Sequence, residues 1–364
     1  MVQLKRLLSR NAKNRIKYRL STPKGRYDKY RGTRKVVVCL GADYGNLGDV
    51  AITFAQILFL KSLFPGYAVI EFPLSQTYTS MKDLERIIEK NDIITTVGGG
   101  NTAGRYLDIE ECRQFVLERF KNNTVICFPQ SVDFTDASFR GKFISTYSKH
   151  PKLLYMVRER FSYEAVRSAV PGLRLSLCPD IVFSLGETID PSSCIRAGVV
   201  ISLRNDKERL MDASDRADLL HCVTRRTELT EMDTQVEADC FSFDKRVALL
   251  SELLDVYSRS KLVVTDRLHG MILAYVTRTP CIVFSGDNPK IEGCYDWVKT
   301  SRSIVFFENY NRHTFEDALS DLLRQGWREC VTPPSFDEMR RLILDFVSSG
   351  NMNSGDWFQH GQFK

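Results

Sequence analysis

The chain has 364 residues, of which 43% are hydrophobic and 26% charged, and its formal net charge is +6 at pH 7. A chain of this length exceeds one ordinary domain, so two domains are expected. The hydrophobic share is typical of a globular protein with packed cores, which excludes a chain that is disordered throughout.

The positive charge is concentrated at the N-terminus. Residues 1–35 contain thirteen Lys or Arg and one acid, Asp28, which leaves 38 bases and 44 acids in the rest of the chain, a net charge of −6. Apolar residues recur in this arm at roughly helical spacing, namely Leu4, Leu7, Leu8, Ile16 and Leu20. A basic, helical arm favours an anionic membrane surface as its partner. The alternative is a solvated, partly disordered tail, and nucleic acid is not expected because the arm lacks a basic motif interleaved with aromatic residues.

The ten cysteines include no CxxC pair, and several lie inside apolar runs, such as Cys39, Cys127 and Cys281. Buried free thiols are therefore expected rather than disulfides or a zinc site, and neither a metal nor a cofactor is predicted. No apolar segment follows the basic start as a signal peptide would require, and no run approaches the ~18 apolar residues that span a bilayer. We expect a cytoplasmic protein, associated with the inner face of the cell membrane where the arm binds lipid.

From Lys35 onward, short apolar runs alternate with helical patterns. Residues 36–40 (VVVCL) are typical of a strand buried on both faces, residues 41–49 of a Gly-rich turn, and residues 50–64 of an apolar helix. Further strands are expected at 67–74, 92–97, 153–160 and 174–184, and residues 124–132 are expected to be a strand that runs into a loop. Further helices are expected at 80–90, 109–121 and 137–149. This alternation predicts a parallel sheet covered by helices on both faces.

The polar segment 186–197 is expected to link this domain to a second one. Strands are expected at 198–206, 261–266 and 280–285, and helices at 244–258, from near His269, and at 335–348, the last packing back across the first domain. The very polar residues 207–239 are interpreted as helix and loop, and the last fourteen residues as poorly ordered. The predicted fold class is α/β, with a basic arm (1–34), two Rossmann-like domains (35–190 and 195–330) facing across a cleft, and a C-terminal helix and tail (331–364). In such sheets, ligands bind beyond the carboxyl ends of the strands.

The first candidate site follows the first strand of the first domain. It contains Gly41, Gly45, Asn46, Gly48 and Asp49. Glycines between a strand and a helix let backbone N–H groups approach an anion at the helix N-terminus. The spacing fits neither a dinucleotide-binding motif nor a P-loop. Asp49 has a simpler alternative role as the N-cap of the helix.

Two further segments end strands of the same sheet. Gly98, Gly99, Gly100 and Asn101 follow the strand at 92–97, where a tight turn or a bound ligand would explain three consecutive glycines. The segment Pro129-Gln130-Ser131 adds an amide and a hydroxyl at the same edge. Both segments are therefore candidates for ligand contact.

In the second domain, Arg204 ends the first strand, and Thr265-Asp266-Arg267-Leu268-His269-Gly270 joins another strand to a helix. Arginine binds carboxylates and phosphates through paired hydrogen bonds, although Arg204 in an interdomain salt bridge is the alternative. His269 exchanges a proton near neutral pH, and the helix start attracts anions. A purely structural histidine is the other interpretation of His269. Asp287-Asn288-Pro289-Lys290 follows the next strand and is expected to border the same cleft.

In chain order, a set of short segments resembles the polysaccharide pyruvyl transferase family. The segments are GNLGD (45–49), GGGN (98–101), PQS (129–131), RER (158–160), CPD (178–180), SLRND (202–206), TDRLHG (265–270) and PCIVF..DN.K (280–290). The resemblance covers about Lys35 to Trp297, and TDRLHG is its most specific part. It implies two Rossmann-like domains like those of GT-B glycosyltransferases.

The resemblance also implies a reaction, in which pyruvate passes from phosphoenolpyruvate to two hydroxyls of a sugar, forming a cyclic ketal and releasing phosphate. Arg204, Arg267 and His269 are then expected to be catalytic, and His269 to protonate the methylene carbon of the donor. The donor side comprises Arg204, Arg267, Leu268, His269, Gly270, Asn288 and Lys290. The acceptor or anion side comprises Gly45, Asn46, Gly48, Asp49, Gly99, Gly100, Asn101, Gln130 and Ser131. The implied acceptor is a saccharide of a surface polysaccharide or its lipid-linked precursor.

Two other functions remain open at this point. A nucleotide-sugar glycosyltransferase on the same fold would use the arginines on a diphosphate, but no acidic residue is evidently placed to hold a ribose. A non-catalytic scaffold or sugar-binding protein would tolerate replacement of Arg267 and His269.

Overall fold

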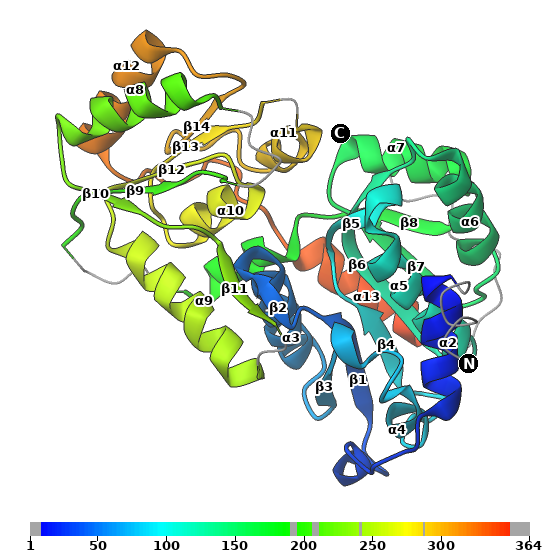
Figure 1. Ribbon diagram of the computed structural model, residues 1–364. Coiled ribbons are helices and arrows are strands. Elements are labelled where there is room, and N and C mark those ends of the chain that lie inside the picture. The colour runs from blue at the N-terminus through cyan, green and yellow to red at the C-terminus, as the bar shows by residue number, and fades with distance from the viewer. Residues whose placement is uncertain (1–8, 190–194, 206–210, 240–241, 287, 350–364) are drawn as a thin grey trace, which may run out of the picture.

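A computed structural model describes residues 9–189, 195–205, 211–239, 242–286 and 288–349. Figure 1 shows two sheets, each with helices on both faces, joined near the middle of the molecule. The two larger sheets are entirely parallel. The predicted α/β fold with two Rossmann-like domains is therefore confirmed.

The first domain contains a seven-stranded sheet in the order β3-β1-β4-β6-β7-β8, with β5 paired to β6. Its strands are β1 (Lys35–Gly41), β3 (Ala68–Pro73), β4 (Ile93–Thr96), β5 (Gly99–Ala103), β6 (Thr124–Asp133), β7 (Leu153–Val157) and β8 (Arg174–Leu177). Its helices are α3 (Leu47–Leu63), α4 (Met81–Glu85), α5 (Leu107–Arg119), α6 (Ala137–Tyr147) and α7 (Arg160–Ala169), and its 3-10 helices are η1 (Asp28–Tyr30), η2 (Leu74–Gln76), η3 (Gly104–Tyr106) and η4 (Ile181–Glu187).

The second domain contains a five-stranded sheet in the order β10-β9-β12-β13-β14. Its strands are β9 (Val199–Ser202), β10 (Leu229–Glu231), β12 (Leu262–Thr265), β13 (Cys281–Phe284) and β14 (Ile304–Phe307). Its helices are α8 (Ala213–Thr224), α9 (Phe243–Ser258), α10 (Leu268–Val276), α11 (Pro289–Tyr295) and α12 (Arg312–Gln325).

Both sheets follow the same winding rule. In the first sheet β1 lies between β3 and β4, and in the second sheet β9 lies between β10 and β12. The direction of winding therefore reverses beside β1 and beside β9. Ligands of doubly wound sheets bind at this reversal, beyond the carboxyl ends of the strands. The segments that follow β1 and β4, and those that follow β9 and β12, therefore hold the expected ligand positions.

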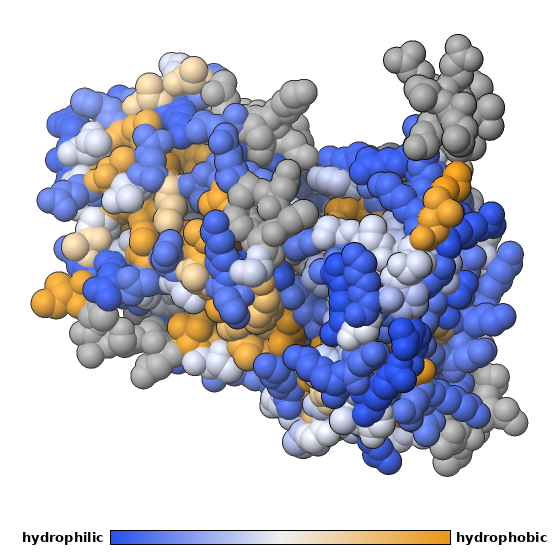
Figure 2. All heavy atoms as spheres, turned by 60° about the horizontal axis from the view of Figure 1, so that its bottom comes forward, coloured by the Kyte–Doolittle hydropathy of each residue, from blue (hydrophilic) through white to orange (hydrophobic). Residues whose placement is uncertain are grey.

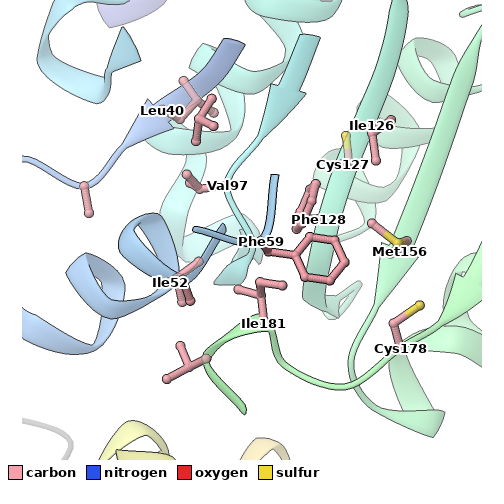
Figure 3. Close-up of a cluster of buried hydrophobic side chains, with 14 of the residues drawn as sticks. Leu40, Ile52, Phe59, Val97, Ile126, Cys127, Phe128, Met156, Cys178 and Ile181 are labelled. Carbon is pink, nitrogen blue, oxygen red and sulfur yellow. The ribbon is translucent and has the colours of Figure 1, made fainter. Parts of the chain in front are cut away.

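One part of the first domain's core lies between the sheet and α3. Figure 3 shows Phe59 of α3 beside Phe128 of β6, with Ile181 of η4 below them; the rings of Phe59 and Phe128 are 6.2 Å apart at their centroids. Cys39, Cys127 and Cys281 are free and fully buried, as predicted. Burial of such side chains supplies most of the free energy that stabilises the domain.

A third, two-stranded sheet joins the domains. Strand β2 (Tyr44–Asn46) of the first domain pairs antiparallel with β11 (Gln235–Asp239), which follows β10 of the second. The Leu47 N–H also donates to the Thr234 carbonyl at 2.8 Å. Nearby, the buried Arg246 of α9 donates two hydrogen bonds to the Glu71 carboxylate and a third to the Ala42 carbonyl. The domains are thus connected by backbone pairing as well as by side chains.

Two terminal helices cover the first domain. Helix α13 (Asp337–Ser349) returns from the second domain, and Phe336 beside it contacts Phe59 of α3. Helix α2 (Arg10–Leu20) packs on α5 through Tyr18, whose ring lies 5.1 Å from that of Phe115, and through the ion pair of Arg15 with Glu118. The arm beyond residue 8 is therefore a docked segment and no solvated tail. Leu4, Leu7 and Leu8 lie outside the described residues, as do residues 351–364.

The structure corrects several local predictions. The region 207–239 contains α8, β10 and β11 where helix and loop were expected, because β10 extends the second sheet and β11 pairs with β2. Residues 207–210 lie outside the described part. The helix expected at 80–90 is only α4, and the three-glycine segment enters a strand, β5, which pairs with β6. Among the described residues, no helix is both long enough and apolar enough to cross a bilayer.

Candidate functional site

A cavity of about 300 Å³ lies between the two domains at the carboxyl ends of their strands. The first domain contributes Tyr44, Asn46, Asp49, Gly100, Asn101, Arg105, Tyr106, Ile109 and Arg158. The second domain contributes Arg204, Thr234, Gln235, Arg267, Leu268, His269, Asn288 and Lys290. Five of these side chains are Arg or Lys and one is a carboxylate, so the cavity suits a ligand with more than one negative charge.

Ten predicted residues line this cavity. They are Asn46, Asp49, Gly100, Asn101, Arg204, Arg267, Leu268, His269, Asn288 and Lys290. The parallel strands bring them together, because loops after neighbouring strands meet at one edge of each sheet. Asp287 lies outside the described residues.

Several predicted glycines do not line the cavity but pack behind the residues that do. A Cβ at Gly48 would lie 2.5 Å from Nδ1 of His269, so this glycine makes room for the imidazole. A Cβ at Gly270 would overlap the Thr265 hydroxyl, and Gly99 has a φ of +118°, which disfavours other residues. Gly45 is buried within β2, and a Cβ at Gly41 would overlap the Glu71 carboxylate. These glycines serve close packing beside the site.

Gln130 and Ser131 also lie behind the cavity wall, because β6 continues through them and β5 pairs alongside. Both side chains are fully buried. The Gln130 amide donates to the Val97 and Phe128 carbonyls at 2.5 and 3.1 Å, and its oxygen accepts a bond from Arg113. Arg113 also binds the Asn101 side chain. Gln130 therefore helps to hold Asn101 and does not reach a ligand directly.

The side chain that caps α3 is Asn46, whose oxygen accepts from the Gly48 N–H at 3.0 Å. The predicted alternative role of Asp49 as the N-cap is therefore wrong. Asp49 faces the cavity and accepts a hydrogen bond of 2.9 Å from the Tyr44 hydroxyl. Burial raises the pKa of Asp49, and the opposing effects of His269 and Tyr44 do not cancel this rise. A carboxylate with a raised pKa is a stronger proton acceptor than an ordinary one.

His269 lies in the first turn of α10, beside the first domain. Its Nε2 is 3.6 Å from Oδ2 of Asp180, the residue that caps η4. Asp180 also accepts a 2.5 Å bond from Arg158. Burial would raise the pKa of Asp180, but its interactions with His269 and Arg158 outweigh burial and hold that pKa well below its ordinary value. Asp180 is thus an ionised carboxylate beside the histidine.

A pair of cations meets beside Gly100. A Cβ at Gly100 would lie 3.1 Å from Nη2 of Arg158 and 3.3 Å from Nζ of Lys290. Lys290 donates a 3.0 Å hydrogen bond to the Gly100 carbonyl. Burial, together with the positive charges of Arg158 and Arg105, lowers the pKa of Lys290 to about 8. An anion in this corner would relieve the repulsion between the cations.

A second pair of cations lies at the strand ends of the second domain. The Arg204 N–H donates a 2.8 Å bond to Asp266, which joins the residues after β9 and β12. The buried Arg267 forms an ion pair of 2.7 Å with Asp233, just before β11. The cavity therefore has cationic groups on both domains, as a ligand with two separated anionic groups requires.

Sequence reasoning did not name seven of the lining residues as site residues. These are Tyr44, Arg105, Tyr106, Ile109, Arg158, Thr234 and Gln235. It also did not assign a role to Asp180. Arg158 and Asp180 lie in the RER and CPD segments of the family resemblance, which could have identified them. Thr234 and Gln235 could not be found this way, because the cavity reaches them only through the pairing of β11 with β2.

The comparisons with known proteins identify the family of this chain. The family model for polysaccharide pyruvyl transferases matches residues 46–288. General stress protein 30 of Bacillus subtilis is 33% identical over 87% of this chain and 92% of its own length. Pyruvyl transferase 1 of Schizosaccharomyces pombe is 28% identical over 70% of this chain and 67% of its own length.

The fold is also similar to that of a Listeria monocytogenes structure described as a UDP-N-acetylglucosamine 2-epimerase. The TM-score is 0.54 at 11% identity, covering 89% of this chain and 98% of that one. At this identity the likeness concerns the GT-B-like fold alone. The family match, residues 46–288, includes every residue that lines the cavity except Tyr44 and Lys290. The chain belongs to the polysaccharide pyruvyl transferase family and is a transferase of the pyruvyl type.

Proposed function

We propose that this protein transfers pyruvate from phosphoenolpyruvate to two hydroxyls of a sugar, forms a cyclic ketal and releases phosphate. The observation that carries the proposal is the composition of the cavity, with five basic side chains and one histidine around a single carboxylate, Asp49. Phosphoenolpyruvate carries a phosphate and a carboxylate, and each needs its own cationic partner. Arg158 with Lys290, and Arg204 with Arg267, provide two such pairs.

In the proposed reaction, His269 donates a proton to the methylene carbon of the donor, and C2 becomes electrophilic. One sugar hydroxyl adds to C2 and gives its proton to Asp49, whose raised pKa favours this transfer. The second hydroxyl then forms its bond to C2 as the C2–O bond to phosphate breaks, and its proton returns to His269. The proton on Asp49 leaves with the phosphate. The atoms therefore balance without a cofactor.

The arginines and Lys290 would stabilise the negative charge on the departing phosphate. A positioned general acid typically contributes about 10²–10⁴ in rate. Loss of His269 should therefore reduce turnover by an amount in this range and leave donor binding nearly unchanged. Loss of Arg204 or Arg267 should lower turnover and also weaken donor binding.

The rival function is transfer of a sugar from a nucleotide sugar. A GT-B enzyme of that kind needs a group that holds the nucleotide in the second domain. Among the described residues, no carboxylate of the second domain lines the cavity. The family match also favours pyruvyl transfer.

A lipid-linked saccharide is the acceptor class that we propose, because the arm presents a suitable surface to an anionic membrane. The outer face of α2 carries Lys13, Ile16, Lys17 and Leu20, all exposed and spaced as one helical stripe. Leu20 is 77% exposed. The Arg10 side chain of the same helix pairs with Asp108 of α5, and the next residue of α5, Ile109, lines the cavity. Helix α2, which carries the stripe, therefore contacts a helix that borders the cavity. Figure 2, which turns the lower end of the molecule toward the viewer, shows a mostly hydrophilic face with small hydrophobic patches.

The test is phosphate release from phosphoenolpyruvate in the presence of galactose-, mannose- and glucosamine-containing lipid-linked acceptors. Wild type should release phosphate only with the correct acceptor, and His269→Ala should lose this release. His313→Ala is the matched control, because His313 lies exposed on α12. Donor binding is measured on the same samples by calorimetry. Binding of a nucleotide sugar without binding of phosphoenolpyruvate would overturn the proposal.

A further inference from the structure

The His269 side chain belongs to the second domain but is enclosed by the first. Gly48 of α3 lies against the edge of the imidazole, so close that a Cβ would meet three of its side-chain atoms within 2.8 Å. Asp180 faces Nε2 from the start of η4 at 3.6 Å. The orientation of the ring is thus set by residues from the opposite side of the domain interface.

Asp180 is itself held in place. Its Oδ1 accepts a 2.9 Å hydrogen bond from the Val182 N–H, and its Oδ2 accepts a 2.5 Å bond from Nη1 of Arg158. The Arg158 Nε is bound by Ser131 and Glu159, both fully buried. Each oxygen of Asp180 therefore has a fixed partner, and the carboxylate cannot turn away from the histidine.

We infer that Asp180 is the positioning residue of His269, holding the imidazole across the domain interface through its buried Nε2, while the other ring nitrogen, Nδ1, delivers the proton to the donor. This inference rests on the proposed function of His269 as a proton donor. The separation of 3.6 Å is that of an ion pair and exceeds a hydrogen bond. Hydrogen bonds in active sites often tighten only when substrate binds.

The other charged groups at this cavity do not have this geometry. Asp49 lines it from α3 and is bound by Tyr44, while Arg105, Arg158, Arg204, Arg267 and Lys290 are cations. Asp180 is the carboxylate that the structure places at ion-pair distance from His269 within the described residues. A negative charge at this distance favours the protonated imidazole.

The variant Asp180→Asn tests the inference, because asparagine keeps the size of the side chain and its capping oxygen but removes the charge. We expect kcat to fall about tenfold or more, with the Kd of phosphoenolpyruvate nearly unchanged. The alkaline limb of the kcat profile should move about one pH unit lower. In a His269→Gln background, Asp180→Asn should add no further loss, because it acts through the histidine. Asp180→Glu should restore part of the turnover.

The matched control is Asp212→Asn, which removes a charge from the exposed N-cap of α8 and should leave kcat and its pH profile unchanged.

A second measurement needs neither turnover nor substrate. In protein labelled at its five histidines, the resonance that His269→Gln removes should titrate at lower pH in Asp180→Asn than in wild type. An unchanged titration, or additive losses in the double variant, would overturn the inference. Should Asp180→Asn not fold, the wild type alone decides, since with phosphoenolpyruvate bound it must show a slowly exchanging imidazole N–H proton that His269→Gln lacks. An absent wild-type signal overturns the inference, whereas an absent turnover with a normal titration overturns only the proposed function.

Discussion

Lys290 Nζ donates a 3.0 Å hydrogen bond to the carbonyl oxygen of Gly100, and so joins α11 of the second domain to β5 of the first. A Cβ at Gly100 would lie 3.3 Å from this ammonium group and 3.1 Å from Nη2 of Arg158, so the two cationic groups flank the same backbone position. The charge of Lys290 is therefore held at a position where a donor phosphate would be recognised.

This placement predicts a pH dependence of donor binding. The pKa of Lys290 is lowered to about 8, so the side chain is charged below that pH and neutral above it. The affinity for phosphoenolpyruvate should therefore fall as pH rises from 7 to 9. Titration calorimetry of wild type across this range measures the effect. Lys290→Arg should bind equally well at pH 7 and pH 9, whereas Lys290→Met should bind weakly at both. A wild-type affinity that is constant over this range would exclude Lys290 as a donor contact.

Gly48→Ala should impair turnover without removing a functional group. The new methyl group would meet the His269 side chain at 2.5–2.8 Å and displace the imidazole. A misplacement of about 1 Å costs on the order of 10²-fold in rate. Steady-state kinetics measure this loss. Gly141→Ala, on the exposed part of α6 with nothing within 4 Å of the new Cβ, is the control and should be fully active. Equal activity of the two variants would show that the packing of Gly48 on His269 has no catalytic importance.

Arg246→Ala should destabilise the junction between the domains. The change leaves the Glu71 carboxylate and the Ala42 carbonyl without their partner in a mostly buried position. Breaking a buried ion pair costs about 3–5 kcal/mol in the free energy of unfolding. Urea denaturation measures this cost. Arg324→Ala is the comparison, because its ion pair with Asp321 is exposed and such pairs are worth about 0–1 kcal/mol. Similar midpoints for both variants would mean that the Arg246 cluster does not stabilise the junction.

The α2 stripe should bind anionic vesicles. Lys13→Glu with Lys17→Glu should reduce sedimentation with phosphatidylglycerol vesicles about tenfold or more, since each basic side chain near such a surface contributes about 1 kcal/mol. Leu20→Ser should weaken binding further by removing exposed apolar surface. Lys261→Glu with Arg302→Glu changes the charge equally on the second domain and should have no effect. Equal binding of all variants, or wild-type binding to neutral phosphatidylcholine alone, would contradict the proposal.

Most of the fold could be predicted from local patterns. Runs such as Val36–Leu40 and Leu262–Thr265 are apolar and β-branched because both faces of a parallel strand are covered. The residues at the ends of these strands, Arg204, Arg267 and His269 among them, could be placed in one cavity by the winding rule of such sheets.

The remainder depends on contacts between distant segments. Strand β11 (QVEAD) is too short for its alternation to stand out in the very polar region around it, and it pairs with β2 of the other domain. Gln130 also depends on a distant segment. The sequence predicts it at the end of a strand, but it lies inside the longer strand β6 because β5 pairs beside it. The neighbourhood of Asp180 and His269 joins positions 89 residues apart in sequence, and no local pattern encodes that distance.

The return of the chain to its first domain has a consequence for biosynthesis. Phe336 covers Phe59, and Met339, Ile343 and Phe346 of α13 complete the same apolar cluster. These residues are translated after the whole second domain. The apolar face of the first domain that they cover therefore stays exposed until the second domain has been synthesised. The first domain is therefore completed last. A chain that stops before Phe336 leaves this apolar face exposed and should be bound by chaperones or degraded by proteases.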